Sequence, residues 1–453
     1  MKINKIADVF RTTGQPTVTY VERKSGDYEK KLSGYLDECG QICLVTGPSK
    51  TGKTTLYKRV LGNRGEIPLV VQCTVDRKCE EIWRVALEQV NFERISRRSN
   101  SEAVGTAMEA GADVEFGWHW LAKITGKLSA SASESEAEDV VKERILSRPS
   151  PDLLIPILRD TNYVLVIEDF HYLDDKEKRV LFQQWKRFVD SEISIIILGT
   201  SHRAVDIANS NKDLIGRVSQ IDIGRWSNED LSKICRQGFE YLGYKAYSNI
   251  INTICTESVG LPIIVQQVCL QLFNNENIFL VNIAKKKEKK FDNRNCEDAF
   301  YEVASEKYSQ LETYYQTLIR GPREKNRKYK TYELVIGCFS VDPISFSLTR
   351  KEIDERLDKV CVNSKSRPPA ASINSTLGAL KKFQDKRDFN LLEWRPSEDT
   401  LYIVEPTFLF YVRWRRKAEK GVGVQLDFLS ELLLMIRDDN DKSKDPAIKG
   451  DGD

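Results

Sequence analysis

The stretch "GPSKTGKTTL", residues 47 to 56, limits what this 453-residue chain can fold into more than any other feature. It directly follows the apolar run "QICLVT" (41–46), whose alternation is typical of a buried parallel strand, and it leads into "KTTLYKRVL" (53–61), which has a helical pattern. A strand, a glycine-rich loop and a helix in this order place backbone N–H groups and a helix N-terminus around a phosphate. The spacing of two glycines, a lysine and a threonine therefore predicts a phosphate-binding loop.

The residue types in this loop indicate ATP with Mg²⁺ as the ligands. Lys53 would reach the β- and γ-phosphates, and the hydroxyl of Thr54 would hold the Mg²⁺ ion. The candidate ATP-binding residues of the loop are Gly47, Pro48, Ser49, Lys50, Thr51, Gly52, Lys53, Thr54 and Thr55.

A second element, "NYVLVIEDFHYLDD" (162–175), supplies carboxylates. Residues 164–167 predict a buried strand that ends at Glu168 and Asp169. We expect Glu168 to bind Mg²⁺ and Asp169 to orient the attacking water, although an acidic strand end that only faces solvent is the alternative. The usual order in such ATPases is Asp and then Glu, and the shorter Asp169 would sit farther from the water, so we expect slow hydrolysis. His171 either senses the γ-phosphate or caps the next helix, and the structural role is favoured.

Further apolar strands alternate with amphipathic helices along the chain. Strand patterns at 67–75, 193–201 and 217–226 join the two above, and five short apolar strands separated by helices predict a doubly wound parallel sheet. Thr200, with Ser201, follows one strand where it could touch the γ-phosphate or the water. Arg217 precedes the last strand, where an arginine commonly faces a neighbouring subunit's nucleotide, worth ~10³ or more in rate. Both are otherwise ordinary loop residues.

Helical patterns at 227–243 and 247–273 predict a small helical lid after the sheet. Between two of its helices, "GLP" (260–262) predicts a rigid turn placed over the adenine ring, which makes Pro262 a candidate contact.

These segments together resemble a known family. The loop at 47–55, "VIEDFHYL" (166–173), "ILGTSHRA" (197–204), "DLIGRVSQIDIGRWSNEDL" (213–231) and the turn "GLP" are similar to the AAA+ and STAND NTPases, above all to origin-recognition-like and archaeal-type ATPases, over about residues 10 to 285. The resemblance implies that the segment 10–38 lines the adenine, with Thr19, Tyr20, Val21 and Arg23 near the nucleotide. It also implies a homo-oligomer that forms on ATP binding. The order of Glu168 and Asp169 and the missing lid arginine depart from the family pattern and favour slow turnover.

Residues 99–138 do not belong to the usual sheet. Strict alternation in "AGADVEFGWHWLAKITGKLSASASESEAED" (110–139) predicts an inserted β-hairpin with an aromatic face. That face would pack on the parent domain, contact another subunit or partner, or insert into a membrane.

The C-terminal part predicts a winged-helix domain. Three helical patterns (331–341, 348–360 and 368–389) precede two strands (390–396 and 400–406) and an aromatic helix (407–417). Thr349 and Glu352 have the spacing of a capping box. In a reader of DNA the third helix and the wing would present Ser372, Asn374, Ser375, Lys381, Lys382 and Arg395.

The charge balance of this part favours contact with phosphates, but it does not distinguish a DNA partner from a protein partner. Residues 325–420 contain 20 Lys and Arg against 13 Asp and Glu, an excess of about +7. Winged helices also serve as protein-contact modules, so duplex DNA and a protein partner both stay open.

Composition narrows the remaining classes. No apolar run approaches the ~18 residues of a membrane helix, so we expect no membrane span. The ten cysteines show no paired CxxC pattern, which favours reduced core thiols over a metal site. Reduced thiols are typical of the cytoplasm, where we expect the protein to be. With three histidines, the chain offers no Ser/His/Asp or Cys/His constellation.

The predicted domains are an α/β P-loop NTPase core (1–225, with the β-hairpin insertion 99–138), a helical lid (226–283), a linker helix (284–328), a winged-helix domain (329–420), and a C-terminal helix with a disordered tail (421–453). The expected function is that of an ATP-controlled assembling switch. By the STAND resemblance it would act in prokaryotic stress or antiphage defence. The alternative is a DNA-binding ATPase of the replication-initiator or transposition-regulator type.

Overall fold

The computed structural model describes residues 3–23, 26–91, 146–199, 214, 216–245, 247–286, 290–320, 329–339, 341, 343–361 and 367–415. The chain divides into two compact units. We call Glu22–Gly47 with Gly52–Ile223 the sheet unit, and Met1–Val21, Pro48–Thr51 and Gly224–Asp453 the lid–winged-helix unit. The predicted hairpin at 99–138 lies outside the described residues, and the predicted domain boundaries stay predictions.

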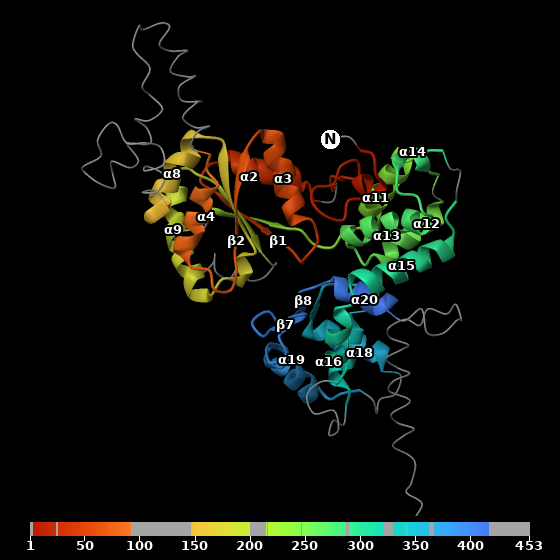
Figure 1. Ribbon diagram of the computed structural model, residues 1–453. Helices are drawn as coiled ribbons and strands as arrows, with labels where there is room; N and C mark the ends of the chain where they lie inside the picture. The colour runs from red at the N-terminus through yellow and green to blue at the C-terminus, as the bar shows by residue number, and fades with distance from the viewer. Residues whose placement is uncertain are drawn as a thin grey trace, which may run out of the picture. The chain divides into compact units, whose positions relative to one another are not determined.

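The sheet unit contains the five-stranded parallel sheet that the sequence predicts (Figure 1). Its strands are β1 (Ile42–Thr46), β2 (Ile67–Gln72), β3 (Tyr163–Glu168), β4 (Ile195–Gly199) and β5 (Val218–Asp222), in the order β2-β3-β4-β1-β5. All four pairings are parallel. Because parallel strands end at the same edge, the loops after β1, β2 and β3 share the carboxyl edge of the sheet.

Helices cover both faces of this sheet. They are α2 (Tyr28–Asp37), α3 (Lys53–Arg64), α4 (Cys79–Glu88), α8 (Pro151–Asp160) and α9 (Asp175–Asp190). The central strand shows why both faces need cover: Cys43 and Val45 belong to the core under α2 and α3, whereas Ile42 and Leu44 belong to the core under α4, α8 and α9. A strand buried on both faces reads as a continuous apolar run, as the sequence of β1 does.

The lid–winged-helix unit begins with the short helix α1 (Ile6–Val9), which packs against the lid. The lid consists of α11 (Asn228–Tyr241), α12 (Ser248–Glu257), α13 (Pro262–Asn275) and α14 (Val281–Ala284), and α15 (Asn293–Lys307) and α16 (Leu311–Arg320) follow it. Phe10, next to α1, contacts Phe239 and Phe273 of the lid with ring centroids 5.6 and 6.2 Å apart. The N-terminal segment is therefore part of the lid's core.

The winged-helix domain has the predicted elements. It contains α17 (Thr331–Cys338), α18 (Arg350–Val360), α19 (Ala370–Asp385), the hairpin β7 (Leu392–Arg395) and β8 (Thr400–Ile403), and finally α20 (Thr407–Trp414). The capping box of α18 is confirmed, because Glu352 N–H donates to Thr349 Oγ1 at 3.2 Å and Thr349 N–H donates to Glu352 Oε2 at 2.8 Å. A third strand, β6 (Ser347–Thr349), pairs with β8 in the order β6-β8-β7 and was not predicted, since three residues are too few to show a period.

The cysteines behave as core thiols. Cys39 is exposed, the other nine are buried, and all ten are free. Burial raises the pKa of the Cys43, Cys73 and Cys79 thiols to about 12, so these thiols stay protonated at neutral pH. Among the residues that the structure describes, no helix is long and apolar enough to cross a membrane.

The side chain of Gln384 closes the turn between α19 and β7, and its removal should destabilise the winged helix. Its Nε2 donates to Leu392 O at 2.6 Å, and its Oε1 accepts from the N–H groups of Leu391 and Leu392 at 2.9 and 3.0 Å. Gln384→Ala strands these buried groups, so we expect a loss of about 2 to 4 kcal/mol in thermal or urea unfolding. Lys381→Ala, at an exposed position of the same helix, should cost less than about 0.5 kcal/mol; equal losses would contradict the assignment.

A candidate nucleotide site at the carboxyl edge of the sheet

The phosphate-binding loop follows β1 and opens α3. Gly52 lies at the N-cap of α3 with φ of 104°, in the left-handed region that favours glycine, and no side chain caps the helix. The first bond of the helix runs from Leu56 N to Gly52 O, which leaves the N–H groups of Lys53, Thr54 and Thr55 without intrahelical acceptors. Lys53 Nζ donates back to Gly47 O at 2.9 Å. The lysine side chain and the first N–H groups of α3 thus gather where the sequence predicts the phosphates.

Glu168 meets the P-loop threonine. It is the last residue of β3, and its Oε1 accepts from Thr54 Oγ1 at 2.8 Å, although 114 positions separate the two residues in the chain. A hydroxyl and a carboxylate are oxygen donors of the kind that Mg²⁺ prefers, with the remaining positions left to phosphates and water. The described residues contain no group of three or more His, Cys, Asp and Glu that could hold a metal ion. The two side chains therefore fit the predicted Mg²⁺.

Asp169 is held by a different partner. Its backbone has φ of 56°, and it precedes the short 3₁₀ helix η1 (Phe170–Tyr172). Its Oδ2 accepts from Gln72 Nε2 at 2.9 Å, and Gln72 is the residue of β2 in register with Glu168. The two neighbouring carboxylates are thus fixed separately, Glu168 by α3 and Asp169 by β2. This separation agrees with distinct roles, and the roles themselves stay predictions.

The sequence analysis missed Gln72. The pattern that could have revealed it is a polar residue at the carboxyl end of an apolar strand. Thr46, at the end of β1, is a similar case, because it donates to Asp222 Oδ1 at 3.3 Å and accepts from Gln220 Nε2 at 3.1 Å. These bonds tie the strand before the loop to β5. His171 lies in η1, and the helix after it, α9, is capped by the side chain of Asp174 rather than by His171.

Arg217 lies far from the loop of its own chain. It is exposed and immediately precedes β5, where Val218 pairs with Ile42 at the amino end of β1. The loop begins at the other end of β1, about 16 Å away for five residues at ~3.3 Å each. A role for Arg217 in catalysis is therefore open only toward another copy of the chain. Thr200 and Ser201 lie outside the described residues.

Tyr20 and Pro262 belong to the lid–winged-helix unit. Within that unit Thr19 Oγ1 donates to Val9 O at 3.0 Å and accepts from Gln266 Nε2 at 2.9 Å, which holds the segment before Tyr20 against the beginning of α13, the helix that starts at Pro262. Their predicted contact with the adenine stays a prediction.

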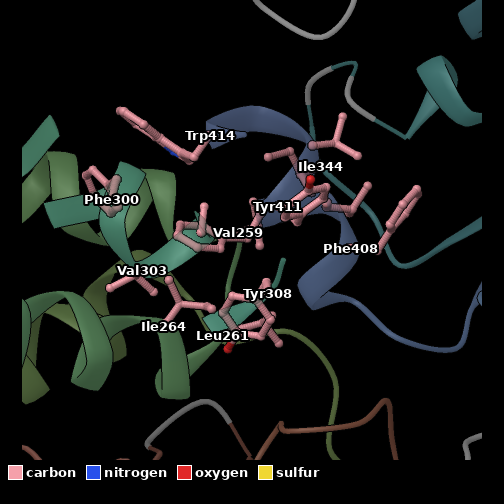
Figure 2. Close-up of a cluster of buried hydrophobic side chains, with 14 of the residues drawn as sticks. Val259, Leu261, Ile264, Phe300, Val303, Tyr308, Ile344, Phe408, Tyr411 and Trp414 are labelled. Carbon is pink, nitrogen blue, oxygen red and sulfur yellow. The ribbon is translucent and has the colours of Figure 1, made fainter. Parts of the chain in front are cut away.

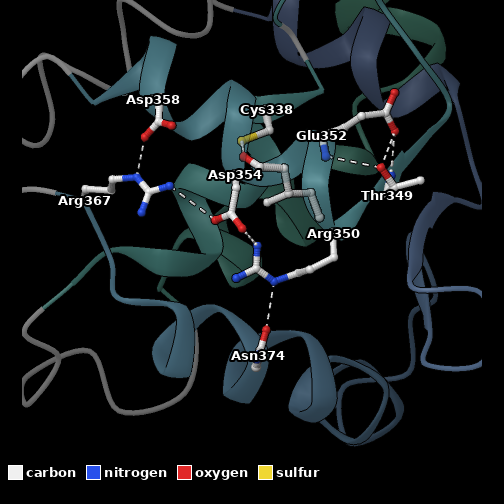
Figure 3. A network of polar contacts seen from close by, with 9 residues as sticks. Cys338, Thr349, Arg350, Glu352, Asp354, Asp358, Arg367 and Asn374 are labelled. Atoms are coloured by element: carbon white, nitrogen blue, oxygen red, sulfur yellow. Dashed lines mark hydrogen bonds and ion pairs between the residues drawn. The ribbon is translucent and has the colours of Figure 1, made fainter.

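Three of the candidate DNA contacts already have partners within the winged helix. Asn374 Oδ1 accepts from Arg350 Nε at 2.8 Å (Figure 3), and the Ser372 hydroxyl lies 2.9 Å from that of Thr331. Arg395 is buried and pairs with Glu393 and Glu398 at 3.5 and 2.7 Å, which argues against a phosphate contact by this residue. Lys381 and Lys382 are exposed on α19, as Ser375 is.

Charge in the described winged helix is nearly balanced. Residues 329–339, 341, 343–361 and 367–415 hold thirteen Lys and Arg against eleven Asp and Glu. Most of the basic excess that the sequence shows over 325–420 therefore belongs to segments outside the described residues.

The loop, the parallel sheet and the domain after the lid form an α/β P-loop fold with an AAA+-like arrangement and a C-terminal winged helix, and in this fold the chain resembles origin-recognition-like ATPases. No family model matches the sequence, and no curated protein matches it.

Three solved structures illustrate the resemblance. A Walker-type ATPase of Pyrococcus abyssi is 14% identical with a TM-score of 0.47, covering 86% of this chain and 98% of its own. The Aeropyrum pernix ORC2 protein is 10% identical (TM-score 0.44; 97% and 100% covered), and Cdc6p from Pyrobaculum aerophilum is 13% identical (TM-score 0.38; 97% and 100% covered). At these values the likeness assigns no activity, substrate or partner to this chain.

The separate anchoring of the two carboxylates gives a test of their roles. Glu168→Gln should weaken binding of an ATP analogue in Mg²⁺ about 10- to 100-fold and leave binding in EDTA unchanged, because Glu168 is the predicted metal ligand. Asp169→Asn should leave both affinities unchanged and lower hydrolysis about 100-fold or more, because Asp169 is predicted to orient the attacking water. Titration with a fluorescent nucleotide and a phosphate-release assay measure the two effects. Exchanged phenotypes would show that the roles are the reverse.

Proposed function

We propose that the chain is an ATP- and Mg²⁺-binding P-loop NTPase that works as a nucleotide-controlled switch, with slow hydrolysis and the winged helix as its output. The observation that carries the proposal is the single core shared by the lid and the winged helix. A switch of this kind needs the element near the nucleotide to be mechanically joined to the element that acts on a partner.

Apolar side chains from the lid turn, the linker helix and α20 form one cluster (Figure 2). Val259 and Leu261 come from the turn before α13, Tyr308 from the end of α15, and Phe408 and Tyr411 from α20, and all are buried. These side chains belong to one buried hydrophobic cluster that runs from the lid into the winged helix. The two therefore move together when either is displaced.

Polar contacts reinforce the same junction. Glu257, at the end of α12, accepts two bonds of 2.9 Å from the Arg413 guanidinium and one of 3.1 Å from Trp414 Nε1. Arg225 Nη1 donates to Ile344 O at 2.7 Å, and its side chain lies so close to Gly260 that an added Cβ would be 2.1 Å from Arg225 Cγ. Gly260 of the "GLP" turn thus leaves the space that the side chain of Arg225 occupies on its way to the winged helix.

Assembly is the second part of the proposal. Arg217 cannot reach the loop of its own chain, so it would complete the site of a neighbouring copy. The most specific part of the proposal is that the protein acts in prokaryotic stress or antiphage defence, and the STAND-like sequence pattern supports it.

The assembly proposal predicts complementation between two inactive variants. Lys53→Ala should lose nucleotide binding, whereas Arg217→Ala should keep it and lose about 10³-fold in hydrolysis. A mixture should regain hydrolysis, since intact loops then meet intact arginines. Particle mass without nucleotide, with ADP and with a non-hydrolysable ATP analogue should grow only with the analogue. An unchanged monomer and an inactive mixture would remove Arg217 from the mechanism.

A DNA-binding ATPase is the second candidate, and the exposed end of α19 favours it. Lys381, Lys382, Lys386 and Arg387 are exposed there, next to Asp385 and Asp388. Against it, the wing between β7 and β8 carries Glu398 and Asp399, which would repel phosphates.

Salt dependence distinguishes DNA binding from protein contact. If the end of α19 contacts phosphates, changing Lys381 and Lys382 to Ala should lower the slope of log affinity for duplex DNA against log salt by about 2. Lys351→Ala, on α18, serves as the control and should leave the slope unchanged. Fluorescence anisotropy with a labelled duplex measures both, and equal slopes would favour a protein partner.

A further inference from the structure

The hydroxyl of Tyr57 is a buried polar group without a well-directed partner. Tyr57 lies on α3 with 0% of its surface exposed, inside the core that α3 forms with β1, β3 and β4. In the described part of the chain its hydroxyl oxygen makes no well-aligned hydrogen bond. Buried hydroxyl groups are nearly always paired, because leaving one unpaired costs the whole of its lost hydration. Phenylalanine would fill the same space without that cost, so the hydroxyl calls for an explanation.

The carboxylate of Glu168 is the candidate partner of this hydroxyl. Tyr57 follows Thr54 by three residues on the helix, so both side chains lie on the same face of α3. Thr54 Oγ1 already donates to Glu168 Oε1 at 2.8 Å. Burial first, and after it the Glu168 carboxylate, raises the pKa of the Tyr57 phenol, which places the two groups near one another. A tyrosine hydroxyl is protonated at neutral pH in any case, so toward a carboxylate it can only donate.

We propose that Tyr57 is a positioning residue for the metal ligand Glu168. The proposal rests on the proposed Mg²⁺–nucleotide site. Of the two hydroxyl groups, that of Thr54 has the well-aligned bond to Glu168, and Thr54 is itself a predicted metal ligand. If Thr54 and Glu168 both held Mg²⁺, the Tyr57 hydroxyl would donate to one carboxylate oxygen of Glu168 and so orient the other toward the ion. Partners of this kind commonly change metal affinity 10- to 100-fold.

The test is the effect of Mg²⁺ on nucleotide affinity in Tyr57→Phe. A non-hydrolysable fluorescent ATP analogue is titrated into the full-length protein, once in Mg²⁺ and once in EDTA. We expect the variant to bind the analogue as the wild type does in EDTA and to lose about 10-fold or more of the tightening that Mg²⁺ gives. The readout is binding, so it does not depend on the rate of hydrolysis.

Tyr244→Phe is a matched control. Tyr244 is also buried, and its hydroxyl is also without a well-aligned partner. It lies in the lid–winged-helix unit, and burial alone raises the pKa of its phenol. The same change there should leave the effect of Mg²⁺ untouched. Because Tyr57→Phe removes an unpaired hydroxyl and keeps the ring, the melting temperature of the metal-free variant should equal or exceed that of the wild type. A clear fall would mean that the hydroxyl holds the fold together, and this would overturn the inference.

The two levels of the proposal fail in different ways. If the wild type binds the analogue more tightly in Mg²⁺ and Tyr57→Phe gains as much, the role of Tyr57 is refuted and the nucleotide site stands. If the wild type binds the analogue in neither condition, the proposed function fails, and the role of Tyr57 fails with it.

Discussion

The bond between Thr54 and Glu168 is the interaction on which the candidate site depends, and it exists because the strands are parallel. β1 and β3 are separated by β4, yet both end at the carboxyl edge, so residues far apart in the chain meet there. An antiparallel arrangement of the same strands would send the loop and the carboxylate to opposite edges. The apolar runs that bury both faces of the sheet are thus also what brings the chemistry together.

The same edge explains why the reversed order of the two acidic residues is compatible with a working site. Glu168 ends the regular strand and faces α3, so the longer side chain takes the position next to the threonine. Asp169 adopts a left-handed backbone, and its carboxylate turns to Gln72. The shorter chain at the second position has less reach, which agrees with the slow turnover proposed for this chain.

Much of the fold was predictable from the sequence because each strand of the sheet carries its own signal. The apolar run before the loop gave β1, the run before Glu168 gave β3, and the spacing of Thr349 and Glu352 gave the start of α18. What could not be predicted depends on pairing in space. Gln72 becomes relevant only through its register with Glu168, and Arg395 reads as a basic wing residue until Glu393 and Glu398 are seen beside it. β6 is an edge strand of three residues, and only its pairing with β8 defines it.

The junction between the lid and the winged helix combines polar and apolar contacts. Glu257 satisfies Arg413 and Trp414 together, and the three groups lie partly buried beside a continuous apolar cluster. Separating the lid from the winged helix would therefore leave a partly buried carboxylate without its cation, which costs more than the pair contributes when intact. The consequence is that a displacement of the lid is transmitted to α20 rather than absorbed at the junction.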